Sequence, residues 1–415
     1  MQSGAKKKPR SSATTTSSGA GASAGDAAVG VRHAWAELPD ALLVSILGLL
    51  LSHRDLLSFS SVCRSWRVLA TTAAPLRHLP PLLLRPSHLT PLLRRHRNPN
   101  PTFNLLDPSS PHSVARSSPL SPQTLSLPFL GLSHGRLILL LSDPDDRDRR
   151  RRRRRLILAD PLTGAELRTP PLPPPNTNLH FGLLTAPLAA PESSLLLLGY
   201  DSFLFQWRPG SPEWLRTPFR VAPTITHIVP FEGRVLAMDD AERLFVIHLA
   251  GDADSCVTEL EVSWVGQKIA PFSLCRYLIV CGSELLLVRF VPSKMMLHLG
   301  IEALRLDRLE PWRWVKMESL GDRALFIGEN YRTLGFSCDS PKKWGGESNS
   351  IYYAGSGNQP WSVLRLGDAA IDLSDPELTL IKDGSPLSRT PKWFYPSLYG
   401  GGQGHGALRA SEPTA

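Results

Sequence analysis

Residues 35–75 read WAELPDALLVSILGLLLSHRDLLSFSSVCRSWRVLATTAAP, and this stretch decides how the N-terminal part of the chain folds. Pro39 suits the first turn of a helix, where its missing N–H removes no hydrogen bond. Apolar residues follow at steps of four, namely Leu38, Leu42, Ile46 and Leu50, with Leu43 and Leu47 beside them. Because residues four apart share one face of a helix, the spacing predicts a helix with one wide apolar stripe.

Two shorter helices are predicted after it. Asp55 introduces a segment that contains Leu56, Leu57 and Phe59. In the third segment the spacing of Val62, Trp66 and Leu69 predicts that they share one helical face. About forty residues bury little apolar surface, so a unit of this size is marginally stable unless it docks on a partner.

The heptapeptide SVCRSWR, residues 61–67, has two interpretations. Cys63 beside Arg64 suggests a reactive thiol, but a nucleophilic cysteine needs a nearby base. No histidine lies within nine residues of Cys63 on either side. Cys63 is therefore interpreted as a small apolar residue on a docking helix, and Trp66 as partly core and partly interface.

The segment resembles the F-box. The resemblance rests on LPDALLVSIL (38–47) and DLLSFSSVCRSWRVLA (55–70), which follow the order of the family's motifs. The proline usual in the loop between the first helices is absent, and the spacing there is one residue longer. The resemblance implies docking on a Skp-type adaptor and, through it, on a cullin ubiquitin ligase. The residues expected to carry that docking are Leu38, Pro39, Leu42, Ile46, Leu47, Leu57, Val62, Cys63 and Trp66.

From about residue 129 the chain consists of short apolar runs separated by turn residues. Examples are RLILLL (136–141), RLILAD (155–160), GRVLAM (233–238) and RLFVIHL (243–249). Such runs predict β-hairpins. Hairpin sets recurring at intervals of about 40–50 residues fit four-stranded blades of a β-propeller. The length leaves room for about six blades, and a pair of β-sandwiches is the structural alternative.

This larger segment resembles the KIB-type β-propeller found behind the F-box in many plant proteins. The motifs that carry the resemblance are SHGRLIL (133–139), DPLTGAELRTPPLP (160–173), WVKMESLGDRALFIG (314–328), SIYYAG (350–355) and KWFYPSL (392–398). The expected fold class is therefore multidomain, a small α-helical F-box followed by an all-β propeller. The expected divisions are a disordered N-terminus at 1–33, the F-box at 35–75, a Pro/Arg/Ser-rich linker at 76–128 that runs into the propeller, the propeller at 129–398, and a flexible Gly-rich tail at 399–415.

Positive charge is concentrated in two short runs. The formal net charge is +9. Without the run Arg149–Arg155 the chain has 39 basic and 37 acidic residues, and without Lys6, Lys7, Lys8 and Arg10 as well it has 35 and 37. A near-neutral body argues against a dedicated nucleic-acid binder. The arginine run is expected at a solvated hairpin tip, either as a tolerated insertion or as a nuclear-import or non-specific polyanion-binding tract.

No cofactor or metal site is expected. The five cysteines are widely spaced and include no C-x-x-C pair, namely Cys63, Cys256, Cys275, Cys281 and Cys338. No apolar stretch reaches the roughly 18 residues of a membrane span, and no G-x-S-x-G, H-E-x-x-H or phosphate-loop motif occurs.

The first hypothesis is therefore a non-catalytic substrate receptor of a Skp–cullin–F-box ligase, in the nucleus and/or cytoplasm, whose propeller binds a target protein. The second is an F-box protein acting outside a ligase, as a scaffold or as a nuclear basic-tract binder. The third is a propeller hydrolase with a degenerate site. Co-purification with Skp and cullin separates the first hypothesis from the other two.

Overall fold

The computed structural model describes most of the region between residues 38 and 397. The described ranges are 38–72, 78–87, 102–110, 116–142, 154–174, 179–199, 203–218, 225–249, 257–265, 275–292, 298–329, 333–355, 359–366, 371–372 and 390–397. The chain divides into two units, 1–38 and 39–415, and every helix and strand below belongs to the second. The segments 1–33 and 399–415, expected to be disordered and flexible, lie outside the described residues.

Three helices form the N-terminal part of the second unit, as the sequence predicts: α1 (Asp40–Leu49), α2 (His53–Ser61) and α3 (Arg64–Thr72). Helix α2 begins at Ser52, whose Oγ accepts a hydrogen bond from the Asp55 backbone N–H at 3.1 Å. This N-cap satisfies one of the free donors of the first turn. The buried apolar side chains of the three helices are Leu43, Leu47, Leu56, Phe59, Trp66 and Ala70.

The predicted placement of Val62 on the third helix is wrong. Val62 is the C-terminal cap of α2, and α3 begins two residues later at Arg64. The break between the helices therefore separates Val62 from the face that Trp66 presents.

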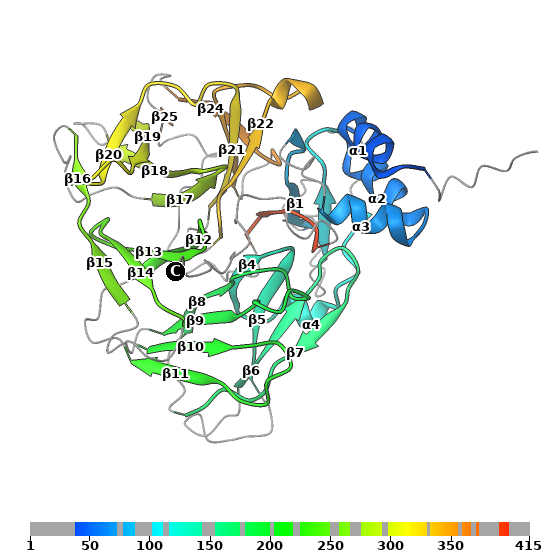
Figure 1. Ribbon diagram of the computed structural model, residues 1–415, viewed down its shortest axis with the longest axis horizontal. Coiled ribbons are helices and arrows are strands. Elements are labelled where there is room, and N and C mark those ends of the chain that lie inside the picture. The colour runs from blue at the N-terminus through cyan, green and yellow to red at the C-terminus, as the bar shows by residue number, and fades with distance from the viewer. Residues whose placement is uncertain are drawn as a thin grey trace, which may run out of the picture. The chain divides into compact units, whose positions relative to one another are not determined.

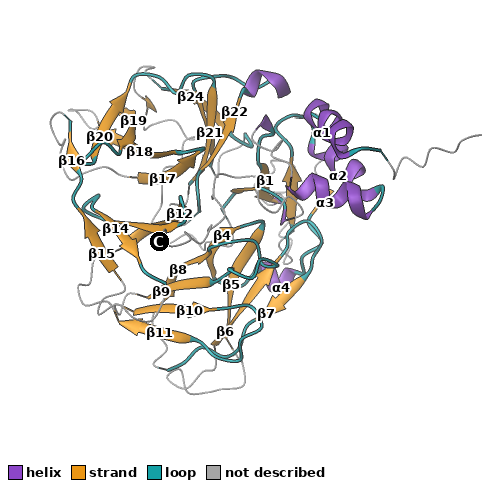
Figure 2. Ribbon diagram, viewed as in Figure 1, coloured by secondary structure: helices purple, strands orange, loops and turns teal. Residues whose placement is uncertain are grey.

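The remaining chain forms a six-bladed β-propeller, as expected, and the helices of the described chain lie mainly in the F-box (Figure 2). Two blades follow the simple four-stranded order: β8 (Leu179–Leu184), β9 (Leu195–Gly199), β10 (Phe203–Trp207) and β11 (Leu215–Pro218), then β12 (Ile225–Phe231), β13 (Arg234–Asp239), β14 (Leu244–Ile247) and β15 (Val257–Leu260). The first-numbered strand of each is innermost (Figure 1).

A third simple blade precedes them: β4 (Phe129–Ser133), β5 (Arg136–Ser142), β6 (Arg154–Ala159) and β7 (Glu166–Arg168). Its pairing of Ser142 with Arg154 confirms that the apolar runs flanking the arginine tract form one hairpin. Arg149–Arg153 lie outside the described residues. Arg154 and Arg155 belong to β6, so the expectation that the whole run forms the hairpin tip is wrong for these two.

Two blades depart from the simple order. One consists of β17 (Cys275–Cys281), β18 (Glu284–Pro292), β19 (His298–Asp307) and β20 (Arg313–Met317), with β16 (Ser263–Trp264) added in parallel to β20 and β25 (Ile371–Asp372) paired to β19. The other consists of β22 (Phe336–Asp339), β21 (Arg323–Gly328), β23 (Ser350–Ala354) and β24 (Ser362–Arg365). There β21 and β23 pair in parallel, with a 3-10 turn at Pro341–Trp344 between β22 and β23.

The sixth blade joins the two ends of the propeller. It consists of β26 (Lys392–Phe394), β1 (Leu82–Pro86), β2 (Phe103–Leu106) and β3 (Arg116–Ser117). The segment 76–128, expected mainly as a linker, therefore supplies three strands of a blade and the short helix α4 (Pro122–Leu125). Its Pro- and Arg-rich composition hides the apolar run Leu82–Leu84, which is buried because it pairs with β26.

The core of the propeller lies between the blades and continues into its closure. Trp393 on β26 packs edge-on against Phe326 of β21, with ring centroids 5.0 Å apart. Its Nε1 donates a hydrogen bond to the Ile327 carbonyl at 2.9 Å. Trp393 of KWFYPSL thus binds the C-terminal strand to the neighbouring blade.

Candidate adaptor-docking surface

The nine side chains expected to dock an adaptor do not share one surface. Leu47 and Trp66 are buried in the three-helix core, with exposed fractions of 1 % and 8 %. Leu38, Ile46, Leu57 and Cys63 are half-buried. Pro39, Leu42 and Val62 are exposed. The structure therefore divides the set into members that hold the helices together and members that face outward.

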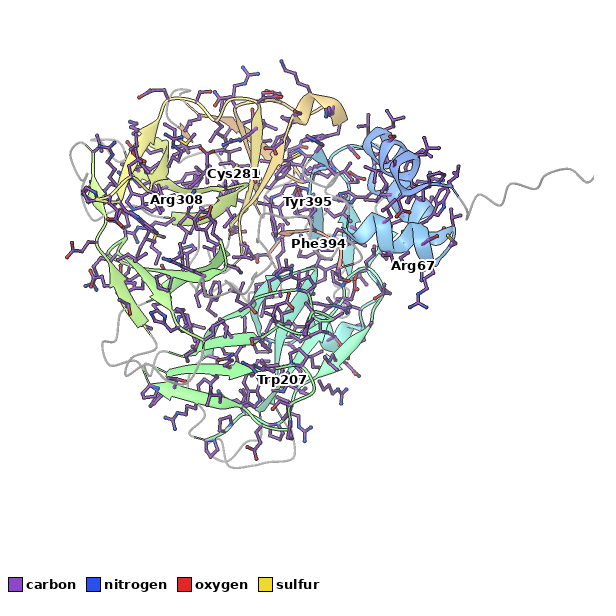
Figure 3. The ribbon with its side chains drawn as sticks, in the orientation of Figure 1. Arg67, Trp207, Cys281, Arg308, Phe394 and Tyr395 are labelled. Carbon is purple, nitrogen blue, oxygen red and sulfur yellow. The ribbon has the colours of Figure 1, made fainter. Side chains whose placement is uncertain are left out.

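Trp66 is part of the F-box core. Its ring lies 4.4 Å from that of Phe59 on α2, measured between centroids. Arg67, the next residue, donates a hydrogen bond from Nε to the Ser60 carbonyl at 3.1 Å (Figure 3). These contacts tie α3 to α2, which explains why tryptophan and arginine stand side by side in SVCRSWR.

Cys63 lies in the break between α2 and α3. Its Sγ is 3.0 Å from the Ser65 hydroxyl. The pKa of the Cys63 thiol is lowered, first by the Ser65 side chain and then by a backbone hydrogen bond from Trp66. Since none of these groups is a base, the geometry gives Cys63 no partner for nucleophilic catalysis.

Four further apolar side chains of the F-box face outward, and the sequence reasoning missed them. They are Val44 (46 % exposed), Leu49 (77 %), Leu51 (41 %) and Val68 (54 %). Together with Leu42 and Val62 they make six of the eleven exposed large apolar side chains in the described chain. The sequence DALLVSILGL could have indicated outward-facing apolar residues, because a helix that is apolar on every side has more apolar surface than one core can bury. These six residues are called the exposed apolar set below.

A joint connects the F-box to the closing blade. His53 of α2 is buried and its Nε2 donates to the Pro80 carbonyl at 2.5 Å. Its ring lies 6.5 Å from that of Tyr395, which follows β26 (Figure 3). Burial lowers the pKa of His53, while the negative charge of Asp107 and the bond to Pro80 act in the opposite direction. A neutral histidine thus joins α2 to the chain that enters β1.

Within the described ranges no group of histidine, cysteine, aspartate and glutamate side chains has the arrangement of a metal site. No helix in that part of the chain is long and apolar enough to cross a membrane. Some of the ionisable residues that are buried in the propeller form ion pairs. The most extensive group links Glu242 to Arg276 and Arg289, and Arg289 in turn to Glu302.

Comparison with protein families matches both parts of the chain. A family model described as the KIB1-4 beta-propeller matches residues 107–377. The chain belongs to this KIB1-4 beta-propeller family. A second model, described as F-box-like, matches residues 35–76, which contain α1, α2 and α3. The KIB1-4 match begins before β3, in agreement with strands lying inside the segment expected as a linker.

No curated protein matches the sequence. Among solved structures the chain is similar to a quinonprotein alcohol dehydrogenase-like protein from Bacteroides thetaiotaomicron, with 11 % sequence identity and a TM-score of 0.32. The match covers 69 % of this chain and 61 % of that one. The two family matches, and not this likeness, give the chain the architecture of an F-box substrate receptor, and both domains are typical of non-catalytic adaptor and receptor proteins.

Proposed function

We propose that this KIB1-4 propeller protein is the substrate-receptor subunit of a Skp–cullin–F-box ubiquitin ligase. The F-box docks on a Skp-type adaptor, and the propeller binds a target protein. Ubiquitin transfer is performed by other subunits, and the receptor contributes proximity by raising the effective concentration of the target near the charged ubiquitin carrier.

The observation that carries the proposal is the exposed apolar set. Leu42, Val44, Leu49, Leu51, Val62 and Val68 lie outside the F-box core within fewer than thirty residues of one another. Scattered single apolar residues are ordinary, but a concentration of this kind on one small module is typical of a protein-binding surface. F-box domains generally bind Skp adaptors, so the adaptor is the partner that this surface fits.

Leu47 and Trp66 support the docking surface rather than form it. Both are buried, so replacing either would weaken adaptor binding by disturbing the helices. A docking test must therefore use exposed positions. The variant Leu42→Asp/Val62→Asp places charge in the exposed apolar set without removing core atoms.

The test is affinity purification of the full chain with mass spectrometry, with the proteasome inhibited. The wild type is expected to recover a Skp-type adaptor and a cullin, and Leu42→Asp/Val62→Asp to lose both at an unchanged melting temperature. Leu309→Asp is the matched control, since Leu309 is 72 % exposed on the propeller. Adaptor without cullin would favour the scaffold function, and full adaptor binding by the double variant would refute the docking surface.

A further inference from the structure

The inner strands of the propeller have two distinct ends, and the F-box joint lies at one of them. Phe394, the last residue of β26, pairs with Leu82, the first residue of β1. Tyr395 then donates its hydroxyl hydrogen to the Leu79 carbonyl at 2.7 Å. Since His53 binds the neighbouring Pro80 carbonyl, this end is called the joint end.

Blade β4–β7 has the same orientation. The turn after β4 lies against the chain that follows β26, because a Cβ on Gly135 would come within 2.2 Å of the Ser397 backbone nitrogen. The turn after β6 also lies there, since Ser397 Oγ donates to Asp160 Oδ2 at 2.6 Å. The connection from β5 to β6 is consequently at the other, distal end, where Ser142 pairs with Arg154.

Two arginines lie toward the distal end of this blade, Arg155 on β6 and Arg168 on β7, and they are called the distal arginine patch. Arg154 and Arg155 begin β6, and Arg168 ends β7 opposite Ile157. Residues two apart on a strand share a face, so the side chains of Arg155 and Arg168 lie on the same side as diagonal neighbours. Arg155 and Arg168 are exposed and Arg154 is half-buried.

Charge is divided between the two ends of the adjoining blades β4–β7 and β8–β11. Blade β8–β11 has the same orientation, because the Leu184 N–H at the end of β8 donates to the Ser133 hydroxyl at the end of β4, at 2.7 Å. The described acidic residues of the two blades all lie in or beside joint-end turns, namely Asp160, Glu166, Glu192 and Glu213. Arg136, at the joint end, reaches Asp160 at 3.5 Å. Within the described chain, neither Arg155 nor Arg168 forms an ion pair, whereas Arg276 and Arg289 share Glu242. Glu166 shares the face of Arg168 two residues away, but its Oε1 accepts a hydrogen bond from the Thr124 hydroxyl.

Two neighbouring sequences lie outside the described residues and form no part of the patch. Residues 143–153, between β5 and β6, contain six arginines and four aspartates. Residues 88–101, between β1 and β2, contain three arginines and no acidic residue.

We infer that the distal arginine patch binds an acidic segment of the target protein, an inference that rests on the proposed function. An arginine guanidinium binds a carboxylate through two parallel hydrogen bonds, and paired arginines on one strand face match successive carboxylates. RNA fits less well, because single-stranded nucleic acid needs aromatic side chains on which bases stack. Strands β6 (RRLILA) and β7 (ELR) contain none. The patch also lies toward the end of the blade opposite the joint end, so a target bound there is expected to leave the F-box accessible.

The test measures the binding of a fluorescein-labelled peptide of ten glutamates to the full chain by fluorescence anisotropy, over a salt series. Arg155→Glu/Arg168→Glu is expected to weaken binding about ten-fold and to flatten the salt dependence. The control Arg208→Glu/Arg234→Glu makes the same change in net charge at two exposed arginines outside the patch, and it should bind like the wild type. A peptide of ten glutamines should not bind. Arg155→Glu/Arg168→Glu retains Arg149–Arg153, so its loss of binding cannot come from that tract.

Unchanged peptide binding by Arg155→Glu/Arg168→Glu would overturn the inference and assign the binding to residues 143–153 or 88–101 instead. It would equally be overturned if an oligouridine RNA bound the wild type more tightly than the peptide and lost affinity in the double variant. Adaptor pull-down with the same proteins separates this inference from the proposed function. Arg155→Glu/Arg168→Glu should still recover the adaptor. If the wild type recovers no adaptor, the proposed function is refuted, whether or not the peptide binds.

Discussion

The Tyr395 hydroxyl donates a hydrogen bond to the Leu79 carbonyl across 2.7 Å, joining two residues 316 positions apart in the chain. Tyr395 follows the last strand of the propeller and Leu79 precedes its first. Pro80, beside Leu79, accepts the hydrogen bond from His53 of the F-box. One short segment therefore serves both the closure of the propeller and its connection to the F-box.

Tyr395→Phe should weaken the closure and the joint together. Removing the hydroxyl leaves a buried carbonyl without this donor, which costs roughly 1–3 kcal/mol in unfolding free energy. Urea denaturation measures that loss. Tyr277→Phe is the matched control, because the Tyr277 hydroxyl donates to the Gly328 carbonyl inside the propeller. Both variants should lose similar stability, but only Tyr395→Phe should speed amide exchange at residues 78–81. Equal exchange in the two variants would show that the joint does not depend on Tyr395.

Gly135→Ala should be far more costly than Gly210→Ala. Both glycines have positive φ, +72° and +88°, where an L side chain is strained by about 1–2 kcal/mol. A Cβ at Gly135 would also lie 2.7 Å from the Tyr395 carbonyl oxygen, whereas Gly210 has nothing within 4 Å. Gly210→Ala should therefore lose only the strain energy, and Gly135→Ala roughly 3 kcal/mol or more. Comparable melting temperatures for the two variants would contradict the close approach of the C-terminal segment.

Glu242→Gln should destabilise the propeller strongly, and Glu232→Gln hardly at all. Glu242 is buried and accepts from Arg276 at 2.8 Å and from Arg289 at 3.0 Å. Removing its charge leaves two arginines short of a partner, at a cost of about 3–5 kcal/mol. Glu232 also pairs with one arginine, Arg308, but both side chains are exposed, so its loss should cost under roughly 1 kcal/mol. Chemical denaturation measures the unfolding free energy of the two variants. Similar losses of unfolding free energy would show that burial does not determine how much each glutamate contributes.

The sequence predicted the blades well because each hairpin is local. The runs flanking the arginine tract pair with each other, and so do most neighbouring apolar runs. The closing blade could not be found in this way. Leu82 pairs with Phe394, so the partner of β1 lies at the other end of the chain and no local pattern indicates it.

The F-box was predicted as a unit, but its two surfaces were not. The apolar residues of α1 occupy all of its faces, so spacing alone does not determine which face meets α2 and α3. The structure buries Leu43 and Leu47 and exposes Leu42 and Val44. The choice depends on tertiary packing, including the contact of Trp66 with Phe59.

Acidification should destabilise the propeller through His227. Burial lowers the pKa of His227 to about 4. A backbone hydrogen bond at Arg276 raises this pKa, and the positive charge of Arg276 lowers it. The unfolded chain then binds more protons than the folded one between pH ~4 and ~6.5. Stability from the neutral ring is complete above pH ~6.5 and is lost as the pH falls toward 4, by up to roughly 3 kcal/mol.

His227→Phe removes this titration and is the variant that checks it. The difference in unfolding free energy between the wild type and His227→Phe should change across pH 4–6.5 and be constant above it. His248→Phe serves as the control for replacing a histidine by phenylalanine at an exposed position. If the difference in unfolding free energy between the wild type and His227→Phe does not change with pH, His227 is not the titrating group.

The last prediction separates stability from docking within the F-box. Trp66→Ala removes a ring that is 8 % exposed and packed against Phe59, so it should cost the three helices roughly 3–5 kcal/mol. Val62→Asp changes a side chain that is 51 % exposed at the end of α2, and it should leave the helices as stable as before. Both variants should lose the adaptor, but for different reasons. Far-ultraviolet circular dichroism at increasing temperature should show early loss of helix in Trp66→Ala only, because Val62 contributes to the surface and Trp66 to the core beneath it. Early melting of Val62→Asp, or full adaptor binding by it, would remove Val62 from the docking surface.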